Sequence, residues 1–151
     1  MSANRQPMLQ DCNCLAVRQA ARHVTQLYDQ FLAPTGLRTT QFSILAKLRF
    51  GGAMTINALA ADMVMDRTTL GRNILPLERD GLITIAPGTI DRRSKEIRLT
   101  EAGAARLRSA IKGWIEAQKH FEATVGEDAS TELRTLLRTV VQTDFAGASS
   151  A

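Results

Sequence analysis

Apolar side chains recur three or four positions apart along most of the chain, and this spacing predicts a mainly α-helical protein. The helical stretches are residues 12–33, 39–51, 55–63, 66–80, 100–125 and 130–145. They are separated by proline, glycine or short polar runs, which favour turns over helix. Hydroxyl residues near two helix starts predict the caps: Thr39 or Thr40 for the second helix, and Ser130 or Thr131 for the last.

The segment between residues 82 and 99 has a different pattern, because β-branched residues replace the helical spacing. Leu82 to Ala86 (L-I-T-I-A) and Glu96 to Leu99 are typical of short strands. A Pro87-Gly88 turn follows the first strand, and the polar run T-I-D-R-R-S-K leads into the second. The pattern predicts a small β-hairpin with a basic tip.

A pair of short helices precedes this hairpin, and their apolar residues define the side that faces the core. The inward-facing residues are Ile56, Leu59, Ala60 and Met63 in the first helix and Leu70, Ile74 and Leu77 in the second. The second helix is left with a polar face at its start, formed by Arg67, Thr68, Thr69, Arg72 and Asn73, with Asp66 as N-cap. Such helices followed by a basic hairpin are the plan of a winged helix-turn-helix, in which one helix enters the major groove of DNA.

Basic residues gather where this plan would place DNA. The net charge of +4 and the pI near 9.6 are compatible with a polyanionic partner, but alone they carry little weight. The distribution is more telling, because basic side chains cluster at the helix start and the hairpin tip: Arg67, Arg72, Arg92, Arg93 and Lys95. Glu78 and Asp80 lie at the far end of the helix. The pattern predicts contact with double-stranded DNA, and a solvated surface with scattered ion pairs is the alternative.

The length of 151 residues predicts a single domain, residues 1–151, with the winged helix-turn-helix at 37–99. No apolar stretch suits a membrane span or a signal peptide, so we expect no membrane partner and a cytoplasmic location. The flanking helices at 12–33 and 100–145 carry more apolar surface than the winged unit needs. We expect them to form a homodimer that presents two recognition helices to an inverted repeat, rather than to close a monomeric core.

Four motifs occur in an order that resembles one family. They are T-T-Q-F at Thr39–Phe42, L-E-R-D-G-L-I at Leu77–Ile83, D-R-R-S-K at Asp91–Lys95 and L-T-E-A-G at Leu99–Gly103. In this order and spacing the chain resembles a MarR-family transcriptional regulator. The resemblance implies a dimer that usually represses transcription and releases DNA when it senses a small phenolic or aromatic acid, an oxidant or occasionally a metal.

The resemblance also implies roles for particular residues. Thr68, Thr69 and Arg72 match the DNA-contacting face of the family's recognition helix. Asp91, Arg93 and Lys95 match its wing, where the aspartate orients an arginine that enters the minor groove. The departures are Gly71, where a hydroxyl residue is common, Pro76 inside the recognition helix, and Thr84–Ala86, where the segment is often basic.

Sensing residues are less clearly marked. The two cysteines, Cys12 and Cys14, lie at the start of the first helix, where a thiolate is stabilised. Cys14 resembles in position the peroxidatic cysteine of OhrR-like sensors, but Val17-Arg18 departs from that motif, so small packed residues at a dimer contact are the favoured interpretation. Tyr28, Phe31 and Trp114 are candidates for an aromatic-effector pocket, with plain core packing as the alternative.

No enzyme motif is present in the sequence: we find no nucleophile with a base at a known spacing, no glycine-rich phosphate loop and no cluster of carboxylates. His23 and His120 have no metal-ligand spacing, so neither a metal nor a cofactor is expected. A thiol-dependent enzyme is the remote alternative. An architectural or RNA-binding winged domain is a third class, and it would show no preference for an inverted repeat.

Overall fold

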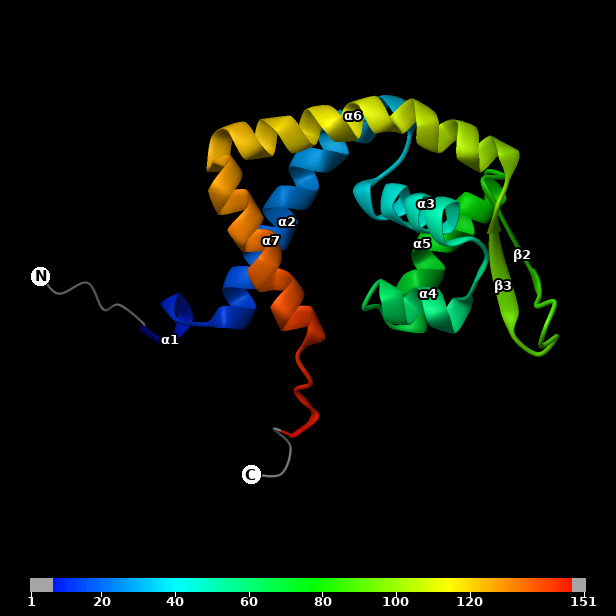
Figure 1. Ribbon diagram of the computed structural model, residues 1–151, viewed down its shortest axis with the longest axis horizontal. Helices are drawn as coiled ribbons and strands as arrows, with labels where there is room; N and C mark the ends of the chain where they lie inside the picture. The colour runs from blue at the N-terminus through cyan, green and yellow to red at the C-terminus, as the bar shows by residue number, and fades with distance from the viewer. Residues whose placement is uncertain (1–6, 148–151) are drawn as a thin grey trace, which may run out of the picture. The chain divides into compact units, whose positions relative to one another are not determined.

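The computed structural model describes residues 7–147 and is mainly helical (Figure 1). Its elements are α1 (Pro7–Gln10), α2 (Asn13–Leu32), the 3₁₀ turn η1 (Ala33–Thr35), α3 (Thr39–Gly51), β1 (Met54–Thr55), α4 (Ile56–Asp62), α5 (Arg67–Arg79), β2 (Ile83–Pro87), β3 (Lys95–Leu99), α6 (Glu101–Val125) and α7 (Glu127–Gln142). They form two compact units, the first ending at Trp114 and the second beginning at Ile115, within α6. The predicted fold class, mainly α with a β-hairpin wing, is confirmed.

The core of the first unit lies between the helix-turn-helix and a small sheet. The predicted inward-facing residues are confirmed: Leu59, Ala60, Leu70, Ile74 and Leu77 are buried, and Ile56 and Met63 are half-buried against them. Helix α3 packs against β3 and α5 packs against β2. Among residues 7–147, no helix combines the length and the apolar character that a bilayer span requires.

The sheet contains a strand that the sequence pattern did not predict. The antiparallel order is β1-β3-β2, with Met54 of β1 and Ile85 of β2 both opposite the fully buried Ile97 of β3. Strand β1 has only two residues, Met54–Thr55, which is too short for an alternating pattern to be recognised. Because β1 leads directly into α4, it ties the helix-turn-helix to the base of the wing.

The predicted cap of α3 is wrong. The helix does begin at Thr39, but Arg38 is the N-cap residue and no threonine side chain caps the helix. The backbone N–H of Arg38 donates to Oε1 of Gln41 (3.1 Å), and the N–H of Thr39 donates to Oδ1 of Asp29 in α2 (2.7 Å). These acceptors satisfy N–H groups that a helix start leaves without intrahelical partners.

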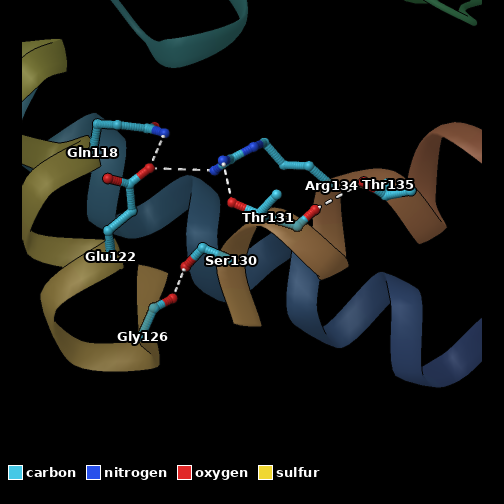
Figure 2. Close-up of polar contacts among 7 residues, drawn as sticks. All are labelled: Gln118, Glu122, Gly126, Ser130, Thr131, Arg134 and Thr135. Atoms are coloured by element: carbon cyan, nitrogen blue, oxygen red, sulfur yellow. Dashed lines mark hydrogen bonds and ion pairs between the residues drawn. The ribbon is translucent and has the colours of Figure 1, made fainter. Parts of the chain in front are cut away.

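The second unit contains the end of α6 and all of α7 (Figure 2). The helices meet at Gly126, whose φ is 104°, a value that glycine adopts without strain and other residues do not. Helix α7 begins at Glu127. The predicted cap at Ser130 or Thr131 is therefore wrong. Ser130 lies inside the helix, fully buried, and its hydroxyl donates to the Gly126 carbonyl (2.6 Å). The helix ends at Gln142, so Phe145 lies beyond it.

A polar cluster joins the two helices of this unit. Glu122 of α6 accepts a hydrogen bond from Gln118 (2.9 Å) and pairs with Arg134 of α7 (3.3 Å), as Figure 2 shows. Several large apolar side chains of α7 remain exposed within the described chain: Leu133, Leu136, Leu137, Val140 and Val141. An amphipathic helix with an uncovered apolar side is available for packing against another surface.

The turn between α4 and α5 contains a strained residue. Val64 has a φ of 53°, and within residues 7–147 no other non-glycine residue has a positive φ. The left-handed region is unfavourable for a β-branched side chain. The turn is held by hydrogen bonds from the Val64 N–H to the Ala61 carbonyl (3.1 Å) and from the Met65 N–H to the Ala60 carbonyl (2.9 Å).

We expect Val64→Gly to stabilise the protein by about 1 kcal/mol. Relief of the left-handed strain outweighs the entropy that glycine adds to the unfolded chain, and little packing is lost because the side chain is 70% exposed. Thermal unfolding should show a melting temperature about 2–4 °C higher. Val64→Ala is the control, since it shortens the side chain but keeps a Cβ at positive φ. A lower melting temperature for the glycine variant would contradict the interpretation.

Candidate nucleic-acid interface

The first turn of α5 is fixed by its own side chains. Asp66 is the N-cap, as predicted, and its Oδ1 accepts the N–H of Thr69 (2.7 Å). Its Oδ2 accepts the Thr69 hydroxyl (2.9 Å). These bonds leave Arg67, Thr68 and Arg72 exposed at the start of the helix, where a groove of DNA would meet them.

Asn73 is more restrained than its neighbours. Its amide Nδ2 donates to the carbonyl of Thr69 (2.9 Å), and the residue is half-buried. A bidentate contact with adenine needs both the amide nitrogen and the amide oxygen. Asn73 would have to leave the Thr69 carbonyl to make that contact, whereas Arg72 is exposed already.

The hydrogen bonds at the cap also change the acidity of Asp66. The N–H of Thr69, and then its hydroxyl, stabilise the carboxylate and lower the pKa of Asp66, with smaller contributions from the Thr68 N–H and the charge of Arg72. A group with a lowered folded-state pKa contributes stability above its unfolded pKa, and that contribution is lost as the pH falls through the folded-state pKa.

We therefore expect the stability difference between the wild type and Asp66→Asn to depend on pH. Asparagine still accepts the Thr69 N–H, so the substitution removes the charge and keeps a capping group. The wild type should be more stable at neutral pH, and the difference should shrink as the pH falls below roughly 4, the pKa of aspartate in an unfolded chain, and be lost once the folded carboxylate is protonated. Denaturant unfolding between neutral and acid pH measures it. A difference that stays constant over this range would rule out the charge as the cause.

The tip of the wing is a tight, internally bonded turn. Oδ1 of Asp91 accepts the backbone N–H of Arg93 (2.9 Å) and lies 3.7 Å from the Arg93 Nε. The N–H of Gly88 donates to the Ser94 carbonyl (2.7 Å), and a Cβ at Gly88 would lie 2.6 Å from the Asp91 carbonyl oxygen. The Arg93 side chain is 96% exposed, so the turn holds its backbone and leaves its guanidinium free to reach outward.

The fold brings the start of α5 close to the strands of the wing. Arg67 of α5 and Lys95 of β3 line the same surface hollow, of about 310 Å³, whose other lining residues include Gly71 and Ile85. Lys95 begins β3 opposite Pro87, so it lies at the end of the paired strands that is nearest the wing tip. In Figure 1 the hairpin extends past α5 with its tip free. Two of the predicted interface residues, one on α5 and one on the wing, therefore border the same hollow of the first unit.

Most of the basic groups in this region have no acidic partner. Within residues 7–147, no salt bridge involves Arg67, Arg72, Arg92 or Lys95, and the Asp91–Arg93 pair is the wing tip's ion pair. Exposed cations without partners raise the local positive potential and are available to phosphates. The charge clustering predicted from the sequence is therefore present in the fold.

The departures from the family pattern have clear structural settings. A Cβ at Gly71 would meet no atom within 4 Å, so the absent side chain leaves open space on α5. Pro76 lies within α5, which nevertheless continues to Arg79, and the Pro76 carbonyl accepts the N–H of Asp80 (3.0 Å). Thr84 and Ala86 are exposed positions of β2, so basic residues are missing from that side of the wing.

The candidate sensing residues lie outside this interface. Cys12 is the N-cap of α2, where its Sγ accepts the N–H of Leu15 (3.4 Å), and Cys14 is exposed on the first turn. Trp114 stacks on Phe42, with ring centroids 6.1 Å apart and an interplanar angle of 11°. Tyr28 and Phe31 are half-buried in α2. Over residues 7–147, His, Cys, Asp and Glu form no group of three or more that could hold a metal ion.

Comparison with known proteins identifies the family. The model of the MarR family matches residues 37–95. The transcriptional regulator MosR of M. tuberculosis, solved in complex with DNA, is 38% identical, with a TM-score of 0.74 over 86% of this chain and 96% of that one. The chain belongs to the MarR family. This MarR-family protein is a DNA-binding transcriptional regulator with a winged helix-turn-helix fold.

Other MarR-like relatives agree. PecS of Dickeya dadantii, an HTH-type transcriptional regulator, is 28% identical over 117 residues, which make up 76% of this chain and 70% of PecS. The transcriptional repressor CouR of Rhodococcus jostii, bound to a 23-mer DNA duplex, is 25% identical with a TM-score of 0.80. That match covers 93% of this MarR-family chain and all of CouR (100%).

Sequence reasoning missed two features of this MarR-family interface. The positive φ of Val64 had no sequence signal, because such turns are expected to contain glycine or asparagine. The exposure of Ile90, which is 98% at the wing tip, was also missed. An isoleucine inside an otherwise polar run is the available signal, but the run as a whole predicts only a turn.

Proposed function

We propose that this MarR-family regulator is a homodimeric repressor of a pseudo-palindromic operator. In this proposal Arg67, Thr68, Thr69, Arg72 and Asn73 of α5 contact the major groove, and Asp91, Arg92, Arg93 and Lys95 form the wing that contacts phosphates and the minor groove. The observation that supports it best is the grouping of exposed basic side chains on α5 and the wing, most of which have no ion-pair partner within residues 7–147. We propose that effector binding changes the separation of the two recognition helices. The effector must then bind the DNA-competent and the DNA-released conformations of the dimer with different affinities.

Dimerisation is the second part of the proposal. Members of the MarR family are dimers. The exposed apolar side chains of α7, including Leu136 (65%) and Val141 (64%), support the same assembly here. We propose that residues 12–33 and 100–145 supply the contacts between subunits, and that residues 37–99 contact DNA. These segments belong to one proposed domain, residues 1–151. The ends of that domain lie outside the described residues.

The direct test is a gel-shift titration with DNA that flanks the protein's own gene. Specific binding should exceed binding to scrambled DNA by roughly a thousandfold or more. Disruption of one half of an inverted repeat should abolish most of this preference, and light scattering should give the mass of a dimer. A single-subunit mass with equal affinity for scrambled DNA would contradict the proposal and favour an architectural or RNA-binding domain.

For the effector, we propose a small aromatic or phenolic acid. Aromatic side chains at Tyr28, Phe31 and Trp114 support a site of that chemistry, although Trp114 is already stacked on Phe42. Addition of aromatic carboxylates to the gel shift should release DNA at saturating ligand. If no aromatic carboxylate releases the protein from DNA but an organic hydroperoxide does, the result would favour a thiol-based sensor instead.

The second candidate is a thiol-based sensor at Cys12 and Cys14. It is favoured by the position of Cys12 at the N-terminus of α2 and by the exposure of Cys14. Organic hydroperoxide should then release DNA stoichiometrically from the wild type and not from Cys14→Ser. Catalytic turnover of peroxide would instead indicate a thiol-dependent enzyme. We propose that the protein acts by binding rather than catalysis, in the cytoplasm, where its operator would lie.

A further inference from the structure

Ile90, at the tip of the wing, is the most exposed of the large apolar side chains in the described chain, at 98%. Scattered exposed apolar residues are common on protein surfaces, so exposure alone does not indicate a role. The setting of Ile90 is unusual, however, because it follows Thr89 and precedes Asp91, Arg92 and Arg93 at the end of an extended hairpin. An apolar group at this position adds nothing to the core of the first unit.

The turn that carries Ile90 is structured. The Gly88 N–H donates to the Ser94 carbonyl (2.7 Å), and the Ser94 N–H and hydroxyl both donate to the Asp91 carbonyl (3.2 and 3.0 Å). Ile90 therefore lies inside a closed hydrogen-bonded turn. Its β-branched side chain also has few rotamers, so little side-chain entropy is lost when it is buried against a partner.

The neighbouring charges indicate what that partner is. Arg92 and Arg93 follow Ile90 two and three positions later in the same turn, and among the described residues only Asp91 pairs with either of them. The surface that fits must offer negative charge and apolar area within a few ångströms. The minor groove of DNA does so, because phosphates line its walls while sugars and base edges form its floor, and apolar side chains can wedge between base steps there.

We propose that Ile90 enters the minor groove beside Arg93 and packs against sugars or a base step. It makes operator affinity depend on how easily that step deforms, because flexible pyrimidine–purine steps are opened at lower cost than stiff A-tracts. This inference rests on the proposed function, since it requires that the wing reaches the minor groove.

The test compares Ile90→Val with Ile90→Thr in full-length protein. Valine and threonine have the same shape, but threonine places a hydroxyl where valine has a methyl group. Operator affinity is measured by fluorescence anisotropy at several salt concentrations. Ile90→Val should bind at most about fourfold more weakly than wild type, because it buries one methylene less, and Ile90→Thr about fourfold more weakly than Ile90→Val. The slope of log affinity against log salt should be unchanged, because no charge is removed.

Arg93→Ala separates this inference from the proposed function. Removal of a cation that lies among the phosphates of the minor groove should weaken binding and reduce the salt slope by up to about 0.9. If Arg93→Ala weakens binding but Ile90→Thr matches Ile90→Val on every operator, the role of Ile90 is refuted while the wing contact stands. If Arg93→Ala has no effect, the proposed wing contact itself is wrong. Unchanged melting temperatures show that the variants fold, as expected for residues this exposed.

Discussion

Gly103→Ala is expected to destabilise the protein by on the order of 3 kcal/mol. A Cβ at Gly103 would lie 2.0 Å from the Leu82 carbonyl oxygen and 2.7 Å from Cδ1 of Leu99. A backbone carbonyl cannot move as a flexible side chain can, and this one also accepts the N–H of Thr100 (3.1 Å). Close-packed interiors do not absorb such an overlap without shifting the backbone. Urea or thermal unfolding of the variant measures the loss.

Gly71→Ala is the matched control, because it makes the same chemical change in another helix. A Cβ at Gly71 would meet nothing within 4 Å, so only the helix propensity of alanine should act. We expect a gain of roughly 0.5–1 kcal/mol. The two variants should therefore change the free energy of unfolding in opposite directions. Equal effects would mean that the junction of α6 with the Gly81–Thr100 region is looser than its distances indicate.

Arg72→Ala should weaken operator binding by about 1–3 kcal/mol, which corresponds to about 5- to 150-fold in affinity. Arg72 is exposed on the first turns of α5 and has no salt-bridge partner among the described residues, so its guanidinium is free to form a bidentate contact with guanine. The loss should be confined to operators that keep the contacted base pair. Anisotropy titrations against a panel of single-base operator variants measure it.

Lys95→Ala is the comparison for this prediction. Lys95 lies where the wing strands meet the tip turn, bordering the same hollow as Arg67, and an ammonium group there would contact phosphate. Its loss should weaken binding to all sequences alike and reduce the salt slope by about 0.9. If Arg72→Ala also weakens every sequence equally, Arg72 contacts the backbone and base recognition belongs to another residue of α5.

The helices and the wing could be predicted from the sequence because each has a strong local pattern. Leu70, Ile74 and Leu77 follow the helical period and are buried, and Asp66 caps α5 as expected. Both signals depend on residues within a few positions of one another. The family motifs also predicted the order of these elements along the chain, because the motifs themselves occur in a fixed order in the sequence.

Features that depend on contacts between distant residues could not be predicted. The start of α3 is capped by Asp29 from α2, ten residues before Thr39, and no rule based on neighbouring residues anticipates that acceptor. Strand β1 forms because Met54–Thr55 pair with the edge of β3, more than forty residues later in the chain. The left-handed Val64 and the outward Ile90 depend on how the surrounding turn closes. At both positions the local preference of the residue and its final conformation or exposure disagree.

The hydrogen bonds from Thr69 to Asp66 hold the leading turn of α5 in helical form in the free protein. Sliding over unrelated sequence should therefore require no refolding of that turn, and only the Asn73 side chain has to leave the Thr69 carbonyl when it meets a base edge. The heat-capacity change on operator binding should then reflect only the area that the contact buries, without the larger change that accompanies folding on binding.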